Sequence, residues 1–258
     1  MSFWKKFRTI VITGASSGIG AAFVPKLREK CPDAHIYGLS RRVPAEGETV
    51  DYEAISVDLT DLTGLQRLEE DFSRIFRNGP VLLINNSGYG LYGPFSPQDV
   101  DKHLNMIDLN VKAPVWMVGK ALPWMRREGG AIINVASTAG FQPTPFLSTY
   151  GATKAFLLHW SMGLHYDLKK DGIRVLALCP GPTATDFFKR AGFEGKVVPD
   201  AFGQTSEEVV QAALRALEKN RSLVVSGWKN KMLMAVSSKL PKAFGTAVSA
   251  RVLAKIRQ

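Results

Sequence analysis

Short runs of apolar residues alternate along the chain with longer segments of helical periodicity. The runs at residues 9–13, 81–84 and 131–135 read Thr-Ile-Val-Ile-Thr, Val-Leu-Leu-Ile and Ala-Ile-Ile-Asn-Val, so they are nearly continuous rather than alternating in polarity. Strands that are buried on both faces of a parallel sheet need such runs, because neither face meets water. This pattern therefore predicts an α/β protein with parallel strands.

Seven segments are predicted as strands, and five helical patterns lie between them. The strands are expected at residues 9–13, 35–40, 54–57, 81–85, 131–136, 173–178 and 223–226, and the helices near 18–30, 61–77, 98–127, 149–170 and 205–220. This order predicts a Rossmann-like, doubly wound, seven-stranded parallel sheet. The longest segment without a clear period, residues 181–203, is a candidate active-site loop.

The net charge of +10 lies at the two ends of the 258-residue chain. Residues 1–10 carry three basic and no acidic side chains, residues 229–258 carry seven and none, and the body between them carries 23 of each. A nucleic-acid groove would place the excess charge on the folded body, so we expect no nucleic-acid partner. We predict one folded domain over residues 1–228, followed by a basic helical extension over residues 229–258.

The cysteine and histidine content favours a cytoplasmic protein without a metal. Cys31 and Cys179 are too few for a disulfide framework, which indicates a reducing compartment. The four histidines are scattered singly and have no zinc-ligand spacing. The first residues lack the apolar run of a signal peptide, and no stretch is long and apolar enough to span a membrane.

A glycine-rich motif, Thr-Gly-Ala-Ser-Ser-Gly-Ile-Gly, follows the first predicted strand at residues 13–20 and precedes a helix. Glycines are needed where the backbone turns tightly, approaches a pyrophosphate and packs a helix closely on a strand. Free N–H groups at the helix start then face the phosphates. We therefore predict a dinucleotide site whose contacts are Gly14, Ser16, Ser17, Gly18, Ile19 and Gly20.

The residues after the second predicted strand indicate which dinucleotide binds. An NAD site places an acidic residue here to hold the ribose hydroxyls, but this chain has Ser40, followed by Arg41 and Arg42. A guanidinium group binds a 2′-phosphate, whereas a carboxylate would repel it. The sequence thus predicts NADP(H), with Arg41 as the principal contact and Arg42 as the second candidate.

Taken together in their order and spacing, these motifs resemble a short-chain dehydrogenase/reductase of about 250 residues. Besides the glycine motif, the matches are Asp58, Asn85-Asn86-Ser87-Gly88, Asn110, Ser137, Tyr150-x₃-Lys154 and Pro180-Gly181. The resemblance implies cofactor contacts from Asp58, Leu59, Asn86, Ser87, Gly88, Tyr150, Lys154, Pro180, Gly181, Thr183 and Thr185. The family usually has alanine where this chain has Ser87, which puts the packing beside the nicotinamide in doubt.

The resemblance implies a catalytic centre of Ser137, Tyr150 and Lys154, supported by Asn110. Tyr150 and Lys154 are four residues apart at a helix start, so their side chains share one face. A free tyrosine has a pKa of about 10 and is a poor base. A nearby ammonium group, a helix N-terminus and an oxidised cofactor ring all favour tyrosinate, so we expect a lowered pKa. The family's serine hydrogen-bonds the substrate oxygen, and its lysine also holds the nicotinamide ribose.

Pro114 gives Asn110 a physical role as well. Proline has no N–H, so the carbonyl of Asn110, four residues earlier in a helical pattern, loses its usual donor and is free to accept from water. In the family, the matching asparagine joins a water-linked proton relay to the lysine. A proline kink without functional consequence is the alternative interpretation.

The predicted function is oxidation or reduction between a carbonyl and an alcohol by hydride transfer with NADP(H). Several aromatic residues are candidates for an apolar substrate wall, although each could equally be core packing: Tyr89, Phe141, Phe146, Phe187 and Phe188. The alternative function is an NADP(H)-binding sensor or scaffold without turnover. Related folds often pair through the helices that carry Asn110 and Tyr150, so a homodimer or homotetramer is expected.

The predicted extension has the pattern of two amphipathic helices. Met232, Val236 and Leu240 recur every four residues, and after Pro241 the apolar stripe is predicted to hold Phe244, Ala247, Val248, Val252, Leu253 and Ile256. The extension's cations, Arg257 included, suit an anionic lipid surface, which Phe3, Trp4, Lys5, Lys6 and Arg8 could join. Packing on the body or on a second subunit is the alternative.

Overall fold

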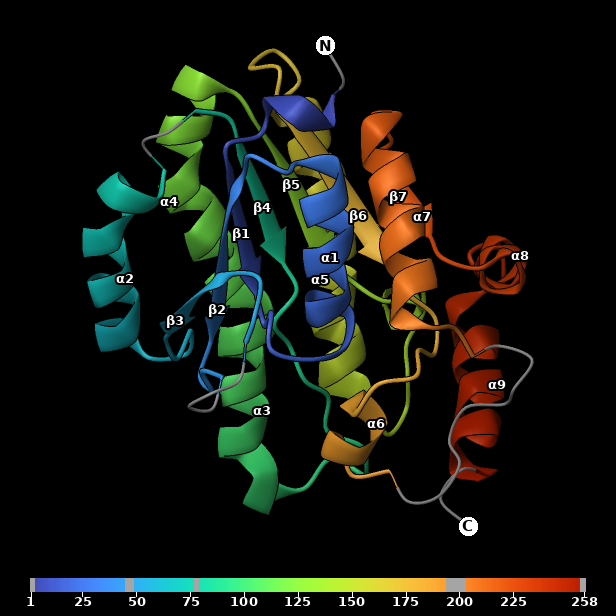
Figure 1. Cartoon of the computed structure of the whole chain (residues 1–258). Helices are drawn as coiled ribbons and strands as arrows, with labels where there is room; N and C mark the ends of the chain where they lie inside the picture. The colour runs from blue at the N-terminus through green and yellow to red at the C-terminus, as the bar shows by residue number, and fades with distance from the viewer. Residues whose placement is uncertain (1–2, 45–48, 77–78, 194–202, 256–258) are drawn as a thin grey trace.

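The computed structural model describes residues 3–44, 49–76, 79–193 and 203–255. Their strands form one parallel sheet in the order β3-β2-β1-β4-β5-β6-β7 (Figure 1). The strands are β1 Thr9–Thr13, β2 His35–Ser40, β3 Glu53–Ser56, β4 Val81–Asn85, β5 Gly130–Val135, β6 Arg174–Cys179 and β7 Leu223–Val225. The predicted Rossmann-like, seven-stranded parallel sheet is confirmed, and β1, β2 and β4 have the predicted bounds.

Helices cover both faces of this sheet, as Figure 1 shows. They are α1 Gly18–Lys30, α2 Leu62–Ile75, α3 Val100–Ile107, α4 Ala113–Glu128, α5 Ser148–Asp167, α6 Phe187–Arg190, α7 Ser206–Glu218, α8 Trp228–Ser237 and α9 Lys242–Lys255. Side chains of β1 alternate between two cores: Ile10 and Ile12 pack with α1 and α7, whereas Val11 packs with α2 and α4. A strand buried on both faces needs apolar residues at every position, which explains its continuous run.

The chain order reverses between β1 and β4, which are neighbours in the sheet although two strands separate them in sequence. The helices that follow these two strands, α1 and α4, pack on opposite faces of the sheet. Ligands of doubly wound proteins bind at such a switch point. The glycine motif follows β1 and the Asn86-Ser87-Gly88 segment follows β4, so both lie at this edge.

The helical pattern predicted near residues 98–127 is confirmed, and the structure divides it into segments of different helical type. A short 3₁₀ turn, Pro97–Asp99, leads into α3, and a π-helical turn, Asp108–Lys112, separates α3 from α4. The sequence pattern showed only one period, since a π turn adds one residue without breaking the helical appearance. The predicted loop 181–203 contains one short helix, α6, and residues 194–202 of this loop lie outside the described ranges.

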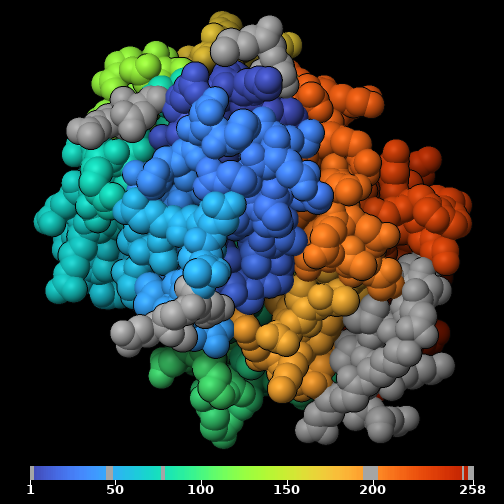
Figure 2. All heavy atoms as spheres, viewed as in Figure 1, coloured from blue at the N-terminus to red at the C-terminus, as the bar shows by residue number. Residues whose placement is uncertain are grey.

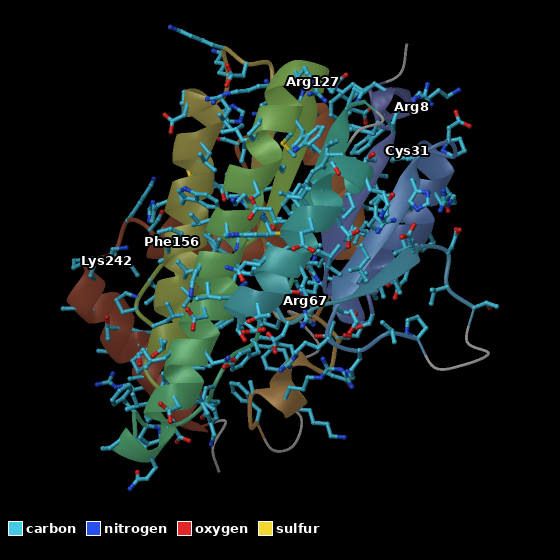
Figure 3. All side chains as sticks on the ribbon, turned by 90° about the vertical axis from the view of Figure 1, so that its left-hand side faces the viewer. Arg8, Cys31, Arg67, Arg127, Phe156 and Lys242 are labelled. Carbon is cyan, nitrogen blue, oxygen red and sulfur yellow. The ribbon has the colours of Figure 1, made fainter. Side chains whose placement is uncertain are left out.

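The N-terminal residues do not join the basic C-terminal surface, so that expectation is wrong. Trp4 is buried in the core between the sheet and α1, and the carbonyl oxygen of Trp4 accepts a hydrogen bond from Cys31 Sγ at 3.2 Å. The large apolar area of an indole ring favours burial over exposure. Arg8 and Cys31 lie on the opposite side of the molecule from Lys242, the first residue of α9 (Figure 3).

The basic extension is helical, as predicted, and its first helix, α8, packs beside the edge strand β7 (Figure 1). Phe244 and Val248 are exposed, Ala247 is exposed and Leu253 is half-buried. Ile256 and Arg257 lie outside the described residues. Within the described ranges, every helix is too short or too polar to cross a bilayer.

Candidate active site

The glycine loop between β1 and α1 depends on three glycines. Gly14 and Gly18 have φ angles of +70° and +56°, in the left-handed region that favours glycine. A Cβ atom at Gly20 would lie 2.1 Å from the carbonyl oxygen of Gly14. The loop therefore lets α1 begin directly against the end of β1 and presents backbone rather than side chains to a ligand.

Asn86, after β4, fixes the shape of this loop. Its Nδ2 donates hydrogen bonds to the carbonyl oxygens of Thr13 (2.9 Å) and Gly14 (3.2 Å). In return, Thr13 Oγ1 accepts from the backbone N–H groups of Asn86 and Ser87, both at 2.9 Å. Because Ser87 contributes only its backbone here, the usual alanine would make the same bond, and the departure from the family pattern leaves this contact intact.

The first turn of α1 is suited to an anion. Its N-cap residue, Ser17, makes no side-chain capping hydrogen bond, and the turn contains no acidic residue. The partial positive charge of the helix N-terminus is therefore not neutralised by its own sequence. Thr185, from the loop after β6, approaches from the other side: a Cβ atom at Gly18 would lie 3.2 Å from its methyl group.

The loop after β6 is fixed by two neighbouring segments. The N–H of Thr138 donates to the carbonyl oxygen of Pro180 at 2.9 Å. A Cβ atom at Gly181 would lie 2.2 Å from the side-chain amide of Asn230, so α8 packs directly on this glycine. Thr183 is buried, and its Oγ1 donates to the carbonyl oxygen of Gly181 at 2.9 Å. These contacts hold the loop beside the carboxyl ends of β5 and β6.

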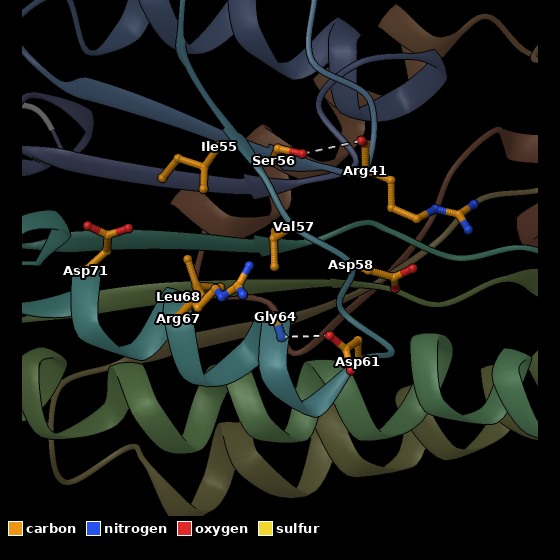
Figure 4. Close-up of a pocket in the computed structure, with 10 residues that line it drawn as sticks. All are labelled: Arg41, Ile55, Ser56, Val57, Asp58, Asp61, Gly64, Arg67, Leu68 and Asp71. Carbon is orange, nitrogen blue, oxygen red and sulfur yellow. Dashed lines mark hydrogen bonds between the residues drawn. The ribbon is translucent and has the colours of Figure 1, made fainter.

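Arg41 and Asp58 border a cavity of about 380 Å³ that lies mainly between β3 and α2 (Figure 4). Burial alone would raise the pKa of the Asp58 carboxyl, but two hydrogen bonds from Thr60 and the charge of Arg41 lower it. Leu59 is buried beside it. Arg41 and Arg42 are exposed, and neither makes an ion pair with a described residue.

Ser40 replaces the ribose-binding acid of an NAD site with a local backbone contact. Its Oγ donates to the carbonyl oxygen of Arg42 at 2.6 Å. Residues 41–44, which directly follow β2, carry two guanidinium groups and no carboxylate, and the next described carboxylate, Asp51, is paired with Arg28. This charge distribution suits a phosphate monoester.

Ser137, Tyr150 and Lys154 are brought together at the carboxyl end of β5. The Ser137 side chain hydrogen-bonds to Tyr150. One turn further along α5, Lys154 Nζ lies 5.8 Å from the centre of the Tyr150 ring and donates to the carbonyl oxygen of Val135 at 2.7 Å. A Cβ atom at Gly88 would lie 3.4 Å from Lys154 Nζ, so the predicted cofactor segment after β4 closes over the lysine.

Burial dominates the titration of this centre. It raises the pKa of Tyr150 to about 12, against a smaller lowering by the hydrogen bond with Ser137. It lowers the pKa of Lys154 to about 8. The expected lowering of the Tyr150 pKa is therefore wrong for the protein alone, because desolvation of the phenolate outweighs the nearby ammonium group. At neutral pH Tyr150 is protonated.

Asn110 lies fully buried in the middle of the π-helical turn. Its Nδ2 donates to Tyr89 O and to Thr153 Oγ1, both at 3.0 Å, and its Oδ1 accepts from the N–H of Tyr89 at 3.2 Å. Thr153 Oγ1 in turn donates to the carbonyl oxygen of Tyr150 at 2.7 Å. Asn110 therefore ties the segment after β4 to α5, between the two residues Tyr150 and Lys154.

Three of the five predicted wall residues pack with Tyr150, namely Tyr89, Phe187 and Phe188. The ring of Phe187 packs on that of Tyr150, with the two ring centres 5.1 Å apart. Phe141 packs in a different cluster, with Leu157 and Cys179. The phenolic oxygen of Tyr89 donates to the carbonyl oxygen of Lys102 on α3, so this side of the site is tied to that helix.

Phe146 adopts a strained backbone conformation, with φ +64°, and its ring lies 6.3 Å from that of Tyr92. A positive φ in a bulky residue costs free energy and is found where the surroundings fix the chain. The carbonyl oxygen of Phe146 accepts from the N–H of Gly93 at 2.8 Å, which provides such a restraint.

Sequence reasoning missed Tyr92 and Phe193, whose stacked rings lie 3.9 Å apart in the same apolar cluster as Tyr150. It also missed that Tyr92 donates through its Oη to the carbonyl oxygen of Leu253 on α9, at 2.7 Å. No sequence pattern links these positions, since they come from three separate segments that only the fold brings together.

Comparison with known proteins identifies the family to which the chain belongs. Residues 8–194 match the short chain dehydrogenase family. The chain belongs to this family. An uncharacterized oxidoreductase of Staphylococcus epidermidis is 29% identical over 206 residues, which cover 76% of this chain and 89% of that protein. The chain is therefore an oxidoreductase of the short-chain type with the Rossmann-like fold already described.

Two solved structures extend the comparison to almost the whole chain. A short-chain dehydrogenase from Sphingobium yanoikuyae in complex with NADPH is 29% identical, with a TM-score of 0.75 and coverage of 92% of this chain and 98% of that one. A bulky-bulky ketone specific alcohol dehydrogenase from Comamonas testosteroni is 28% identical, with a TM-score of 0.71 and coverage of 92% and 96%. Binding of a nicotinamide cofactor thus accords with the family.

Proposed function

We propose that this short-chain dehydrogenase interconverts a ketone or aldehyde and its alcohol with NADP(H). The observation that carries the proposal is the buried group of Ser137, Tyr150 and Lys154 beside the glycine loop. The hydroxyl groups of Ser137 and Tyr150 are linked by a hydrogen bond, and the buried amine of Lys154 lies beside them. All three lie at the carboxyl ends of the strands, where a dinucleotide would bind. Such a pair of hydroxyl groups can hold a carbonyl oxygen and supply its proton.

The residues around the glycine loop and the end of β2 suit NADP(H). Three glycines leave room for a pyrophosphate, the first turn of α1 keeps its N–H groups without a side-chain acceptor, and Arg41 is exposed where a 2′-phosphate would lie. When bound, the cofactor supplies or accepts the hydride. We assign its contacts to the residues predicted from the sequence, with Arg41 as the phosphate ligand and Lys154 on the ribose.

The protein's own groups perform the proton chemistry in this proposal. Ser137 Oγ holds the substrate oxygen, and Tyr150 Oη donates the proton to it during reduction. Because burial raises the pKa of Tyr150 to about 12, the phenol carries this proton at neutral pH. Lys154, held by the carbonyl of Val135, places its charge beside the phenol and stabilises the phenolate that remains. Asn110 positions α5 for both residues.

We propose an apolar substrate of some bulk. The wall beside Tyr150 is formed by aromatic rings from the segments after β4 and β6, Phe187 among them. The ketone specificity named for the Comamonas testosteroni enzyme accords with such a wall. No observation favours the alternative sensor or scaffold without turnover.

A cytoplasmic homodimer or homotetramer completes the proposal. Both cysteines are buried and unpaired, which suits a reducing compartment. Val115 on α4 and Phe156 on α5 are exposed apolar residues on the two helices through which pairing was expected. Light scattering of the purified chain measures the subunit number.

A panel of bulky ketones and aldehydes, followed with NADPH at the nicotinamide absorbance, tests the reaction. We expect Tyr150→Phe to abolish turnover while NADPH binding persists, because only the proton-carrying oxygen is removed. Tyr166→Phe is the matched control, since Tyr166 is 71% exposed on the same helix. Full activity of Tyr150→Phe on a substrate of the wild-type protein would refute the assignment.

A further inference from the structure

The two C-terminal helices expose a concentrated set of large apolar side chains. Trp228, Met232, Leu233 and Val236 of α8 and Phe244 and Val248 of α9 are between 43% and 69% exposed. Residues 228, 232 and 236 recur every four positions, as do 244 and 248, so each helix carries a continuous apolar stripe. We call these six residues the outer apolar face. In Figure 2 the atoms of α8, in red at the right, project beyond the body of the molecule.

The other sides of these helices are fixed to the protein. On α8, Asn230 and Met234 are buried. On α9, Ser249 Oγ accepts a hydrogen bond from Gln142 Nε2 at 2.8 Å, and the carbonyl oxygen of Leu253 accepts from Tyr92 Oη at 2.7 Å. The helices α8 and α9 thus already pack against the rest of the domain through the sides opposite the outer apolar face. The outer apolar face is therefore not the side that the domain itself buries.

The charge carried by the extension itself has one sign. Glu218 is the last acidic residue of the chain, and seven basic residues lie between position 229 and the end. Lys229, Lys231, Lys239 and Arg251 are exposed, and none of them makes an ion pair with a residue that the structure describes. The rest of the chain between residues 11 and 228 is electrically neutral, so the positive charge belongs to this surface and to the distant N-terminal segment.

We propose that the outer apolar face docks on an anionic lipid bilayer. Apolar side chains flanked by unpaired lysines match the interfacial region, where the rings and aliphatic groups enter the headgroup layer and the ammonium groups contact lipid phosphates. A second copy of the chain fits less well. A twofold interface places the same patch against itself, so these unpaired cations would face one another without an acid between them.

Flotation of the full chain with lipid vesicles tests this proposal. Vesicles of phosphatidylcholine with about one third phosphatidylglycerol provide the anionic surface, and pure phosphatidylcholine provides the neutral reference. We expect binding to the anionic vesicles that weakens as salt is added, because screening acts on exposed charges. Binding to the neutral vesicles should be at least tenfold weaker, on the order of the loss of several charge contacts.

Two pairs of substitutions separate the charge from the apolar contribution. Lys229→Gln with Lys231→Gln should weaken binding roughly 30-fold, at about fivefold for each charge near the surface. Met232→Ser with Val236→Ser should weaken it at least about tenfold, through lost apolar burial. Leu62→Ser is the matched control, because Leu62 is 62% exposed at the start of α2, far along the chain from the extension. All four substituted side chains are exposed, so unchanged thermal unfolding is expected.

Two results would overturn the proposal. One is the absence of salt-sensitive binding of the full chain to anionic vesicles. The other is a fall in subunit number, measured by light scattering, when Met232→Ser with Val236→Ser is introduced, which would assign the face to contact between copies. Neither result bears on the ketone reduction, since the assay there uses no lipid.

Discussion

Replacing Arg41 by alanine is expected to reduce the preference for NADP(H). A charge-assisted hydrogen bond to phosphate contributes about 1.5–3 kcal/mol, which is roughly 10- to 150-fold in binding. Arg41 is exposed, so solvent and salt weaken its contribution and we expect the lower part of this range, about 10- to 30-fold weaker NADPH binding. NADH lacks the 2′-phosphate, so its affinity should stay within about twofold.

Titration of nicotinamide fluorescence with each variant gives both dissociation constants. Arg42→Ala is the matched control, because Arg42 is the next residue, is also exposed and does not line the cavity beside Asp58. A loss of NADPH affinity in Arg41→Ala but not in Arg42→Ala is the expected result. An unchanged ratio of the two constants in Arg41→Ala would show that Arg41 does not hold the phosphate, and an equal loss in both variants would refute Arg41 as the principal contact. Arg41→Lys should fall between wild type and alanine, since it keeps the charge but not the fork of donors.

Further predictions concern the glycine loop and the buried lysine. Gly20→Ala should prevent NADPH binding and lower the stability by about 1–3 kcal/mol, since its Cβ would overlap the Gly14 carbonyl. Gly163→Ala, where a Cβ meets nothing within 4 Å, should instead raise the stability by roughly 0.5–1 kcal/mol; denaturant unfolding measures both. Burial lowers the Lys154 pKa from 10.5 to about 8, so between these pH values the unfolded chain binds more protons and Lys154 makes stability rise with pH. Burial raises the pKa of Cys31 to about 11 and of Cys179 to about 12, so these thiols make stability fall as the pH rises above about 9. The Lys154 contribution is therefore the difference between wild type and Lys154→Met in thermal unfolding from pH 7 to 10, and we expect the wild type to gain stability relative to the variant as the pH rises.

The strands were predictable because burial on both faces leaves a plain signature. β1, β2 and β4 are interior strands of the sheet and have the predicted ends. β5 and β6 are shifted by one residue from the prediction, to Gly130–Val135 and Arg174–Cys179. Their ends are set by pairing with neighbours, as in the Ala131–Arg174 register, and such pairing leaves no mark in local sequence.

In the candidate site, too, local features could be predicted from the sequence and contacts between distant segments could not. Residues within one motif, such as Tyr150 and Lys154, could be placed together from their spacing on a helix. The stacking of Tyr92 on Phe193 and the bond from Tyr92 to α9 follow from tertiary packing. The π turn at Asn110 was also hidden, because Pro114 indicated a lost donor but not the wider helical turn that surrounds it.

The one physical expectation that failed at the centre explains how the site would choose between acid and base. The sequence argument gave Tyr150 three sources of positive potential, of which the protein alone supplies the ammonium group of Lys154 and the start of α5. Against the desolvation of a buried phenolate these two are insufficient, and the pKa rises to about 12. Tyr150 is therefore an acid unless a further positive charge is brought beside it. Beside a neutral, reduced nicotinamide ring Tyr150 would stay protonated and could protonate a carbonyl oxygen, whereas beside a positive, oxidised ring it would more readily become the phenolate that takes a proton from an alcohol. In this proposal the charge on the nicotinamide ring, and not Lys154 alone, would determine whether Tyr150 acts as an acid or as a base.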